Sequence, residues 1–142
     1  MLTLELANRI VGEALAEARA RSAKPLAVIV LDAGGHPAAF QREDGASLFR
    51  FDIARAKATG ALGMGADTRD IAARAANNAP FFTSVAIATN GNLALSPGGV
   101  LIRDAGGAII GAVGISGDTG DCDEECALAG IHAAGLGKGT SA

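Results

Sequence analysis

The sequence contains no tryptophan and no tyrosine, and phenylalanine occurs only five times among its 142 residues. Proteins that bind single-stranded nucleic acid stack bases on aromatic side chains and follow the phosphates with clustered Lys and Arg. Here 12 Lys and Arg are outnumbered by 15 Asp and Glu, and the basic residues form no cluster. We therefore expect no nucleic-acid partner; small molecules and further copies of the chain are the expected partners.

Long apolar runs and a set of paired cysteines are also missing. No stretch reaches the roughly 18 to 20 uninterrupted apolar residues that span a bilayer. Glu5 and Arg9 interrupt the N-terminal segment, where a secretory signal would be basic and then apolar. Cys122 and Cys126 are the only thiols, too few for a disulfide scaffold. These absences predict a soluble, cytoplasmic protein with no membrane partner.

Small and aliphatic residues dominate what is present. Hydrophobic residues make up 49% of the chain, so a disordered protein is excluded. The 20 glycines are scattered without a period, which excludes collagen and solenoid repeats. The length predicts a single domain over residues 1–142, with a core built from Ala, Val, Ile and Leu.

Hydrophobic spacing and turn residues predict an order of helices and strands. Apolar residues recur at three- and four-residue spacing from Leu4 to Ala18, which is typical of an amphipathic helix, and Pro25 ends it. A continuous apolar run over 26–31 predicts a strand covered on both faces. The further predicted elements are a strand over 37–43, a helix over 47–64, a short helix from 67 or 68 to 77 closed by Pro80, strands at about 100–103 and 108–116, and a final helix opened by the turn at 117–120.

The two pairs of strands are connected as hairpins rather than through β-α-β units. This order predicts an α+β domain with a largely antiparallel sheet and helices packed on it. In the helix over 47–64, the small residues Ala54, Ala58 and Ala61 predict that another element packs close to this helix. Residues 81–95 fit neither a helix nor a strand clearly.

The end of the first hairpin offers a candidate anion site. Arg42, Asp44 and Ser47 place a guanidinium, a carboxylate and a hydroxyl beside a helix start, where free backbone N–H groups favour anions. A carboxylate ligand would fit there; the alternative is a surface pair of Arg42 with Asp44. Lys57 borders the stripe expected to face the sheet, so it either orients an anion or extends its stem to solvent.

The segment before the final helix is rich in glycine and acid. Ser116 and Gly117 begin a turn whose N–H groups can donate to a ligand, and five carboxylates follow within residues 118–125. A helix start needs only one or two acidic residues, so the surplus suggests cation binding or acid–base chemistry, with solvated capping as the alternative. Asp121 and Glu124 are three residues apart, so both can face one hard cation.

Two histidines complete the candidate set. His36 lies in the first hairpin turn and His132 near the end of the last helix, and either imidazole could ligate iron. The alternatives are an exposed turn residue and a residue that favours the C-terminal end of the helix dipole.

Several short motifs together resemble the GlcG/HbpS family. They are the hairpin over 28–36 that ends in Asp-Ala-Gly-Gly-His, the Arg-x-Asp-Gly-Ala over 42–46, the strand and turn over 110–117, and the Asp-Glu-Glu-Cys-Ala over 123–127. The resemblance covers nearly the whole chain. It implies a profilin-like fold with a five-stranded antiparallel sheet flanked by helices, and homodimers that assemble further.

The same resemblance implies haem or a related tetrapyrrole as the ligand, because relatives and the similar C-terminal domain of PduO-type proteins include haem binders. One branch also binds iron through D/E-x-x-E, a motif matched here by the residues Asp121 to Glu124. The haem-binding histidine of the PduO-type domains belongs to the N-terminal helix, but residues 1–35 of this chain contain no histidine.

Two functional hypotheses follow. In a binding protein, Arg42 or Lys57 would pair with haem propionates, and His36 or His132 would be the axial ligand. In the alternative, a cofactor-free enzyme of isomerase or tautomerase type would act on a small oxoacid. There Arg42 and Lys57 anchor the anion, the turn over 116–118 donates N–H groups, and Asp121 or Glu124 is the base. The enzyme requires Arg42, Lys57 and Asp121 to converge in one narrow site.

Overall fold

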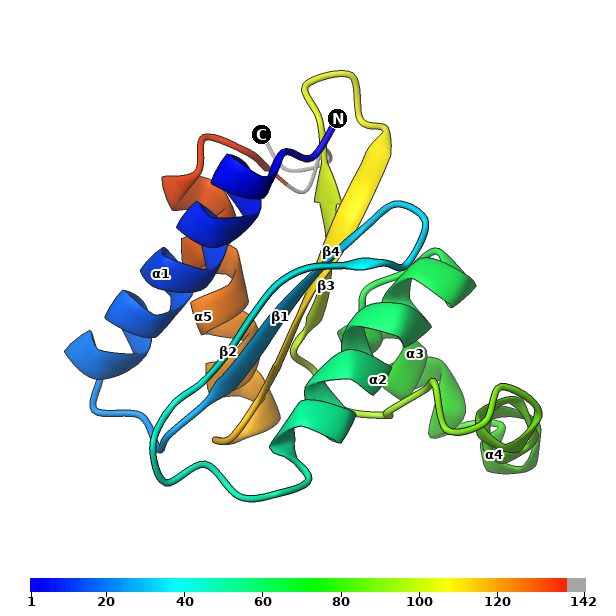
Figure 1. The fold of residues 1–142 in the computed structure, drawn as a ribbon. Helices are drawn as coiled ribbons and strands as arrows, with labels where there is room; N and C mark the ends of the chain where they lie inside the picture. The colour runs from blue at the N-terminus through cyan, green and yellow to red at the C-terminus, as the bar shows by residue number, and fades with distance from the viewer. Residues whose placement is uncertain (138–142) are drawn as a thin grey trace.

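The computed structural model describes residues 1–137 and places a sheet between two layers of helices (Figure 1). Both hairpins and the long helices predicted from the sequence are present. In chain order the elements are α1 (Leu4–Ala20), β1 (Ala27–Asp32), β2 (Pro37–Arg42), α2 (Arg50–Met64), α3 (Thr68–Ala75), α4 (Ala79–Ala88), β3 (Gly99–Arg103), β4 (Ile109–Ser116) and α5 (Gly120–Ala133).

The sheet has the strand order β2-β1-β4-β3, and every neighbouring pair is antiparallel. The expectation of five strands is wrong for the described residues, which form four. Those four are the strands that the residue pattern itself predicts; the fifth came only from the family resemblance. Beyond them, residues 1–137 contain one isolated bridge, between Arg103 and Gly137.

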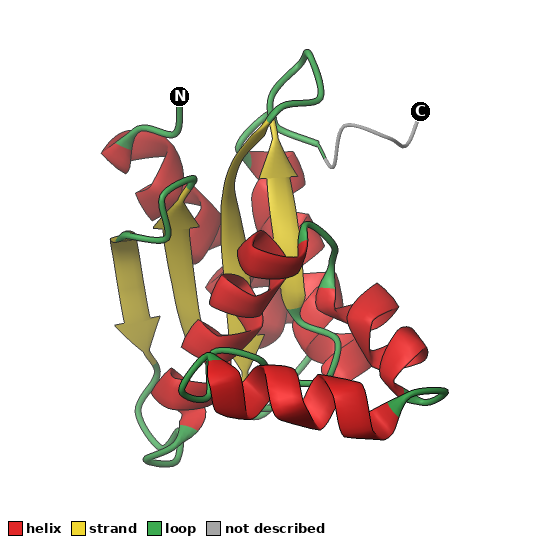
Figure 2. Ribbon diagram, turned by 90° about the vertical axis from the view of Figure 1, so that its right-hand side faces the viewer, coloured by secondary structure: helices red, strands yellow, loops and turns green. Residues whose placement is uncertain are grey.

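The two faces of β1 enter two different cores, as its continuous apolar run predicts. Val28 and Val30 belong to the larger core, which the sheet forms with α1 and α5. Ala27, Ile29 and Leu31 belong to the second core, under α2. This alternation follows from the two-residue period of a strand. Figure 2 shows the helices on either side of the sheet.

Helix α4 occupies part of the segment that the sequence left open. Pro80 does not close the preceding helix but lies in the first turn of α4, where its missing N–H group would have no helical partner anyway. The helix projects from the body beside α3 (Figure 1), and only its Phe82 is buried. Within residues 1–137, no helix is long and apolar enough to cross a membrane.

Candidate functional site

Lys57 lies on α2, and its side chain is enclosed by the end of β4 and the first turn of α5. Its side chain is 3% exposed; Nζ donates to the carbonyl of Ile115 at 2.8 Å and lies 3.1 Å from Oδ2 of Asp123. Burial lowers the pKa of Lys57 and raises the pKa of Asp123. The lysine therefore meets the acidic segment, but its partner is Asp123 rather than Asp121, and its ammonium does not face solvent.

The turn between β4 and α5 is held by its own carboxylates. Oδ1 of Asp123 accepts from the backbone N–H of Asp118 at 3.0 Å, and Oδ2 of Asp118 accepts from the N–H of Lys24 at 2.8 Å. Gly117 is buried, and a Cβ there would lie 2.3 Å from the carbonyl oxygen of Pro25. The turn therefore packs against the chain before β1. Glycine at position 117 lets the backbone of the turn lie close to Pro25.

The hydrogen bonds of Asp118 predict a pH dependence of stability. The N–H groups of Lys24 and then Thr119 hold the pKa of Asp118 below its ordinary value of 3.8. A carboxyl with a lower pKa in the folded state stabilises the fold above its unfolded pKa and loses this contribution as pH falls through the folded pKa. Urea titrations from pH 5 to pH 2 should therefore show a smaller acid loss of stability for Asp118→Asn than for the wild type. Equal losses would contradict this role.

Arg42 lies at the surface, at the end of β2. Its Nη1 donates to the carbonyls of Ala46 at 3.0 Å and Glu43 at 3.3 Å, and no ion pair with Asp44 forms among the described residues. The guanidinium borders an open hollow of about 440 Å³, whose lining is Arg19, Pro25, Arg42, Glu43 and Asp44. The structure therefore leaves Arg42 without a carboxylate partner. A cation that binds an anionic ligand needs to be unpaired in this way.

Ser116 lies in the same row of the sheet as Arg42. Both pair with Ala27 of β1, one from each side, so their side chains project from the same face. Ser116 is 1% exposed, and its Oγ accepts from Nη1 of Arg50 at 3.1 Å. Arg50 was not among the candidate residues that the sequence suggested. The one available signal was Ser47, three residues earlier, whose Oγ accepts from Nε of Arg50 at 3.2 Å.

The predicted cation ligands of α5 both contact one arginine of α3. Nε of Arg69 donates to Oε1 of Glu124 at 2.9 Å, and its Nη2 donates to Oδ1 of Asp121. Sequence reasoning missed Arg69, because nothing local indicates that α3 passes the start of α5. Asp121 is largely exposed, whereas the side chain of Glu124 is 11% exposed.

The two histidines differ in their surroundings. The imidazole of His36 is 80% exposed, and its Nδ1 lies 3.2 Å from Oδ1 of Asp32. The same oxygen accepts from the backbone N–H groups of His36 and Gly34, and these bonds, led by that of His36, lower the pKa of Asp32. The ionised carboxylate therefore favours a proton on Nδ1, which leaves Nε2 free as an acceptor. His132 is exposed in the last turn of α5.

The three residues required for the oxoacid enzyme do not form a common site. Lys57 is buried against Asp123, Asp121 is bonded to Arg69, and Arg42 borders a hollow that neither of the other two lines. An anion anchored by Lys57 would first have to break a buried ion pair. The structure therefore does not support the proton-transfer hypothesis.

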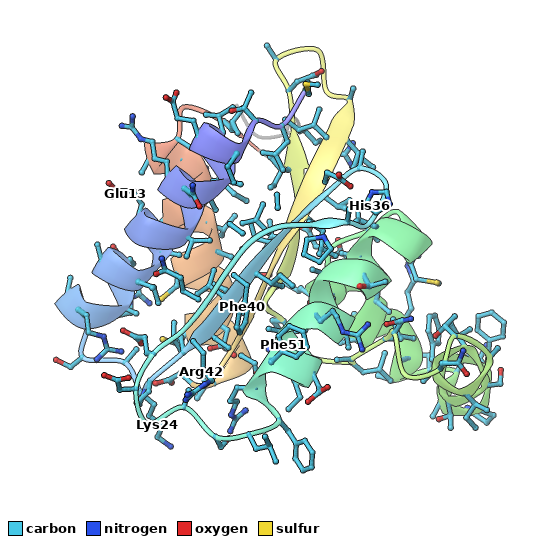
Figure 3. All side chains as sticks on the ribbon, viewed as in Figure 1. Glu13, Lys24, His36, Phe40, Arg42 and Phe51 are labelled. Atoms are coloured by element: carbon cyan, nitrogen blue, oxygen red, sulfur yellow. The ribbon has the colours of Figure 1, made fainter. Side chains whose placement is uncertain are left out.

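Aromatic side chains lie between the predicted ligand residues along β2. The rings of Phe40 and Phe51 meet edge to face with centroids 4.9 Å apart, and the guanidinium of Arg55 lies 6.0 Å from the Phe51 centroid. Figure 3 shows His36 in the turn before β2, Phe40 and Arg42 further along the strand, and Phe51 of α2 beside Phe40. We call these four residues, His36, Phe40, Arg42 and Phe51, the β2 strip.

A family model described as "Haem degrading protein HbpS-like" matches residues 2–132. A search of curated proteins finds no match.

Several solved structures are similar to this chain. The crystal structure of a PduOC:haem complex has a TM-score of 0.86 and 25% identity, and the match covers 96% of this chain and 97% of that one. A double mutant of HbpS from Streptomyces reticuli has a TM-score of 0.78 and 29% identity, over 92% of this chain and 85% of that one. The Klebsiella pneumoniae protein ORFY, at 23% identity, has a TM-score of 0.86 over 94% and 90% of the two chains and supports the fold alone.

Proposed function

The chain belongs to the HbpS-like family, and on this premise we propose that it binds haem or a related tetrapyrrole on the β2 strip. The observation that carries the proposal is the similarity, over almost the whole length of both chains, to a domain crystallised with haem. A cytoplasmic location and self-association remain predictions.

His36 supplies the axial-ligand candidate. A metal-binding histidine usually donates its second ring N–H to a carboxylate or carbonyl, which fixes the tautomer and orients the ring. Oδ1 of Asp32 lies 3.2 Å from Nδ1 of His36, where it can accept this N–H, and the exposed ring leaves Nε2 accessible. The imidazole of His132 makes no hydrogen bond or ion pair within the part of the chain that the structure describes, so we assign the role to His36.

The rest of the β2 strip suits the other parts of a haem. The edge-to-face pair of Phe40 and Phe51 offers apolar contact for a macrocycle. Arg42 offers a guanidinium, which pairs well with a carboxylate such as a propionate. Lys57 is excluded from this role because its ammonium is buried and bonded to Asp123. The residues present therefore fit the group, and bound haem would supply iron-centred redox and ligand-binding chemistry.

Titration with ferric haem, followed by the Soret band, tests the proposal. The wild type should give a saturable red-shifted band, and His36→Ala should change its position and weaken binding. Asp32→Asn should weaken it about 10-fold or more, since outer partners of metal-binding histidines have effects of this size. Arg42→Ala should weaken binding without moving the band, because a propionate partner does not touch the metal.

His132→Ala is the matched control and should titrate like the wild type. Far-UV circular dichroism checks that each variant is folded. An unchanged band and affinity in His36→Ala would disprove the axial ligand. Absence of any saturable Soret change in the wild type would disprove haem binding altogether.

A further inference from the structure

The first turn of α5 carries a D-x-x-E pair that the sequence presents as a cation site, and the structure gives this pair a different partner. Two nitrogens of the Arg69 guanidinium each donate to one carboxylate, Nε to Glu124 at 2.9 Å and Nη2 to Asp121. These hydrogen bonds raise the pKa of Arg69 further above its already high ordinary value. The guanidinium is charged at every physiological pH and bridges both members of the pair.

The position of this guanidinium is the one that a chelated cation would need. A hard cation bound by Asp121 and Glu124 requires free oxygens from both carboxylates on the side that they share. Arg69 already occupies an oxygen of each, and a cation would also meet its positive charge. Moreover, residues 1–137 contain no group of three or more His, Cys, Asp or Glu side chains able to hold a metal ion. The pair as folded does not fit resident iron.

Arg69 also connects a separate part of the molecule to the body. A small core whose buried members include Ile71 of α3 and Phe82 of α4 is distinct from the two cores that flank the sheet. Near Arg69, Oγ1 of Thr68 accepts from the N–H of Gly99 at 2.8 Å, and Oδ1 of Asp67 accepts from the N–H of Leu101 at 2.9 Å. These bonds tie α3 to β3, whereas the bonds of Arg69 tie it to α5.

We propose that Arg69 is an internal cation that closes the Asp121–Glu124 pair, so that this pair fastens α3 to α5 and binds a metal ion only when the arginine is removed. The proposal does not depend on haem binding, because the β2 strip contains none of these three residues.

Anaerobic calorimetry with ferrous iron tests the closure. Arg69→Ala should bind Fe²⁺ at least fivefold more tightly than the wild type. The gain should vanish when Asp121→Asn and Glu124→Gln are added to Arg69→Ala. Arg74→Ala is the matched control, because it removes an exposed guanidinium from the same helix that makes no ion pair with described residues. It should bind like the wild type.

Two outcomes would overturn the closure. In the first, the wild type binds Fe²⁺ as tightly as Arg69→Ala does, and Asp121→Asn/Glu124→Gln abolishes this binding. The pair would then be an open metal site in the wild type. The other is a folded Arg69→Ala with no gain. If Arg69→Ala does not fold, Arg69→Met replaces it: methionine keeps an unbranched apolar side chain but has neither the charge nor the N–H donors of arginine. A gain over the wild type is again expected, and its absence again refutes the proposal.

Hydrogen exchange tests the fastening separately. Amides of α3 should exchange several-fold faster in Arg69→Ala than in the wild type or Arg74→Ala, while those of β1 should be unchanged. Equal α3 exchange in all three proteins would show that the pair does not hold α3, whatever the calorimetry gives.

Discussion

Replacing Lys57 with methionine is expected to lower the free energy of unfolding by about 3–5 kcal/mol, the usual result of removing one partner of a buried ion pair. The cost arises because the carboxylate of Asp123, 1% exposed, is left in the interior without its counter-charge. Methionine also cannot replace the 2.8 Å bond from Nζ to the carbonyl of Ile115. Urea denaturation followed by far-UV circular dichroism measures the change.

Replacing Asp123, the partner of Lys57, together with Lys57 provides a sharper test of the ion pair. Asp123→Asn keeps an oxygen that can accept from the N–H of Asp118, so Lys57→Met/Asp123→Asn has neither buried charge and retains this turn contact. The double variant should be destabilised by clearly less than the sum of the two single variants, since each single variant leaves one unpaired charge. Lys24→Met, at an exposed lysine, should change stability by no more than about 0.5 kcal/mol. A loss below about 1 kcal/mol in Lys57→Met would contradict the role of the pair.

Replacing Gly114 with alanine is expected to cost about 3 kcal/mol or more, at the upper end of overpacking effects. A Cβ at this position of β4 would lie 2.0 Å from the carbonyl oxygen of Ala54 and 2.9 Å from the Cβ of Ala58. The first contact is with helix backbone, so α2 as a whole would have to move away from the sheet. The free energy of unfolding by urea measures the effect.

Gly12→Ala is the control for glycine replacement. Gly12 is exposed inside α1, and a Cβ there would have no heavy atom within 4 Å. Alanine should raise the free energy of unfolding by about 0.5–1 kcal/mol, because glycine loses more conformational freedom in a helix. If Gly114→Ala were as stable as the wild type, the close approach of α2 to β4 would be wrong.

Sequence patterns predicted most of the architecture because those patterns are local. The periodicity of α1, the apolar run of β1 and the glycine-rich turns each depend on residues a few positions apart, and all three are found in the structure. The stripe of small residues on α2 likewise predicted that another element packs close to this helix. In the structure β4 approaches α2 at Ala54 and Ala58. The segment of α4 was left open because its apolar residues, interrupted only by Thr83 and Ser84, show no clear period that distinguishes a helix from a strand.

Partners of charged side chains, by contrast, were decided by the tertiary structure. The enzyme hypothesis from the sequence placed Lys57 with Asp121, but the docking of α2 against the start of α5 pairs Lys57 with Asp123. Arg69 reaches Asp121 from 52 positions away, a contact that no short-range pattern encodes. Composition and spacing thus determined most of the elements and their apolar faces, α4 excepted, because these are properties of neighbouring residues. Which charges meet, and therefore which groups stay free for a ligand, depended on how distant elements pack.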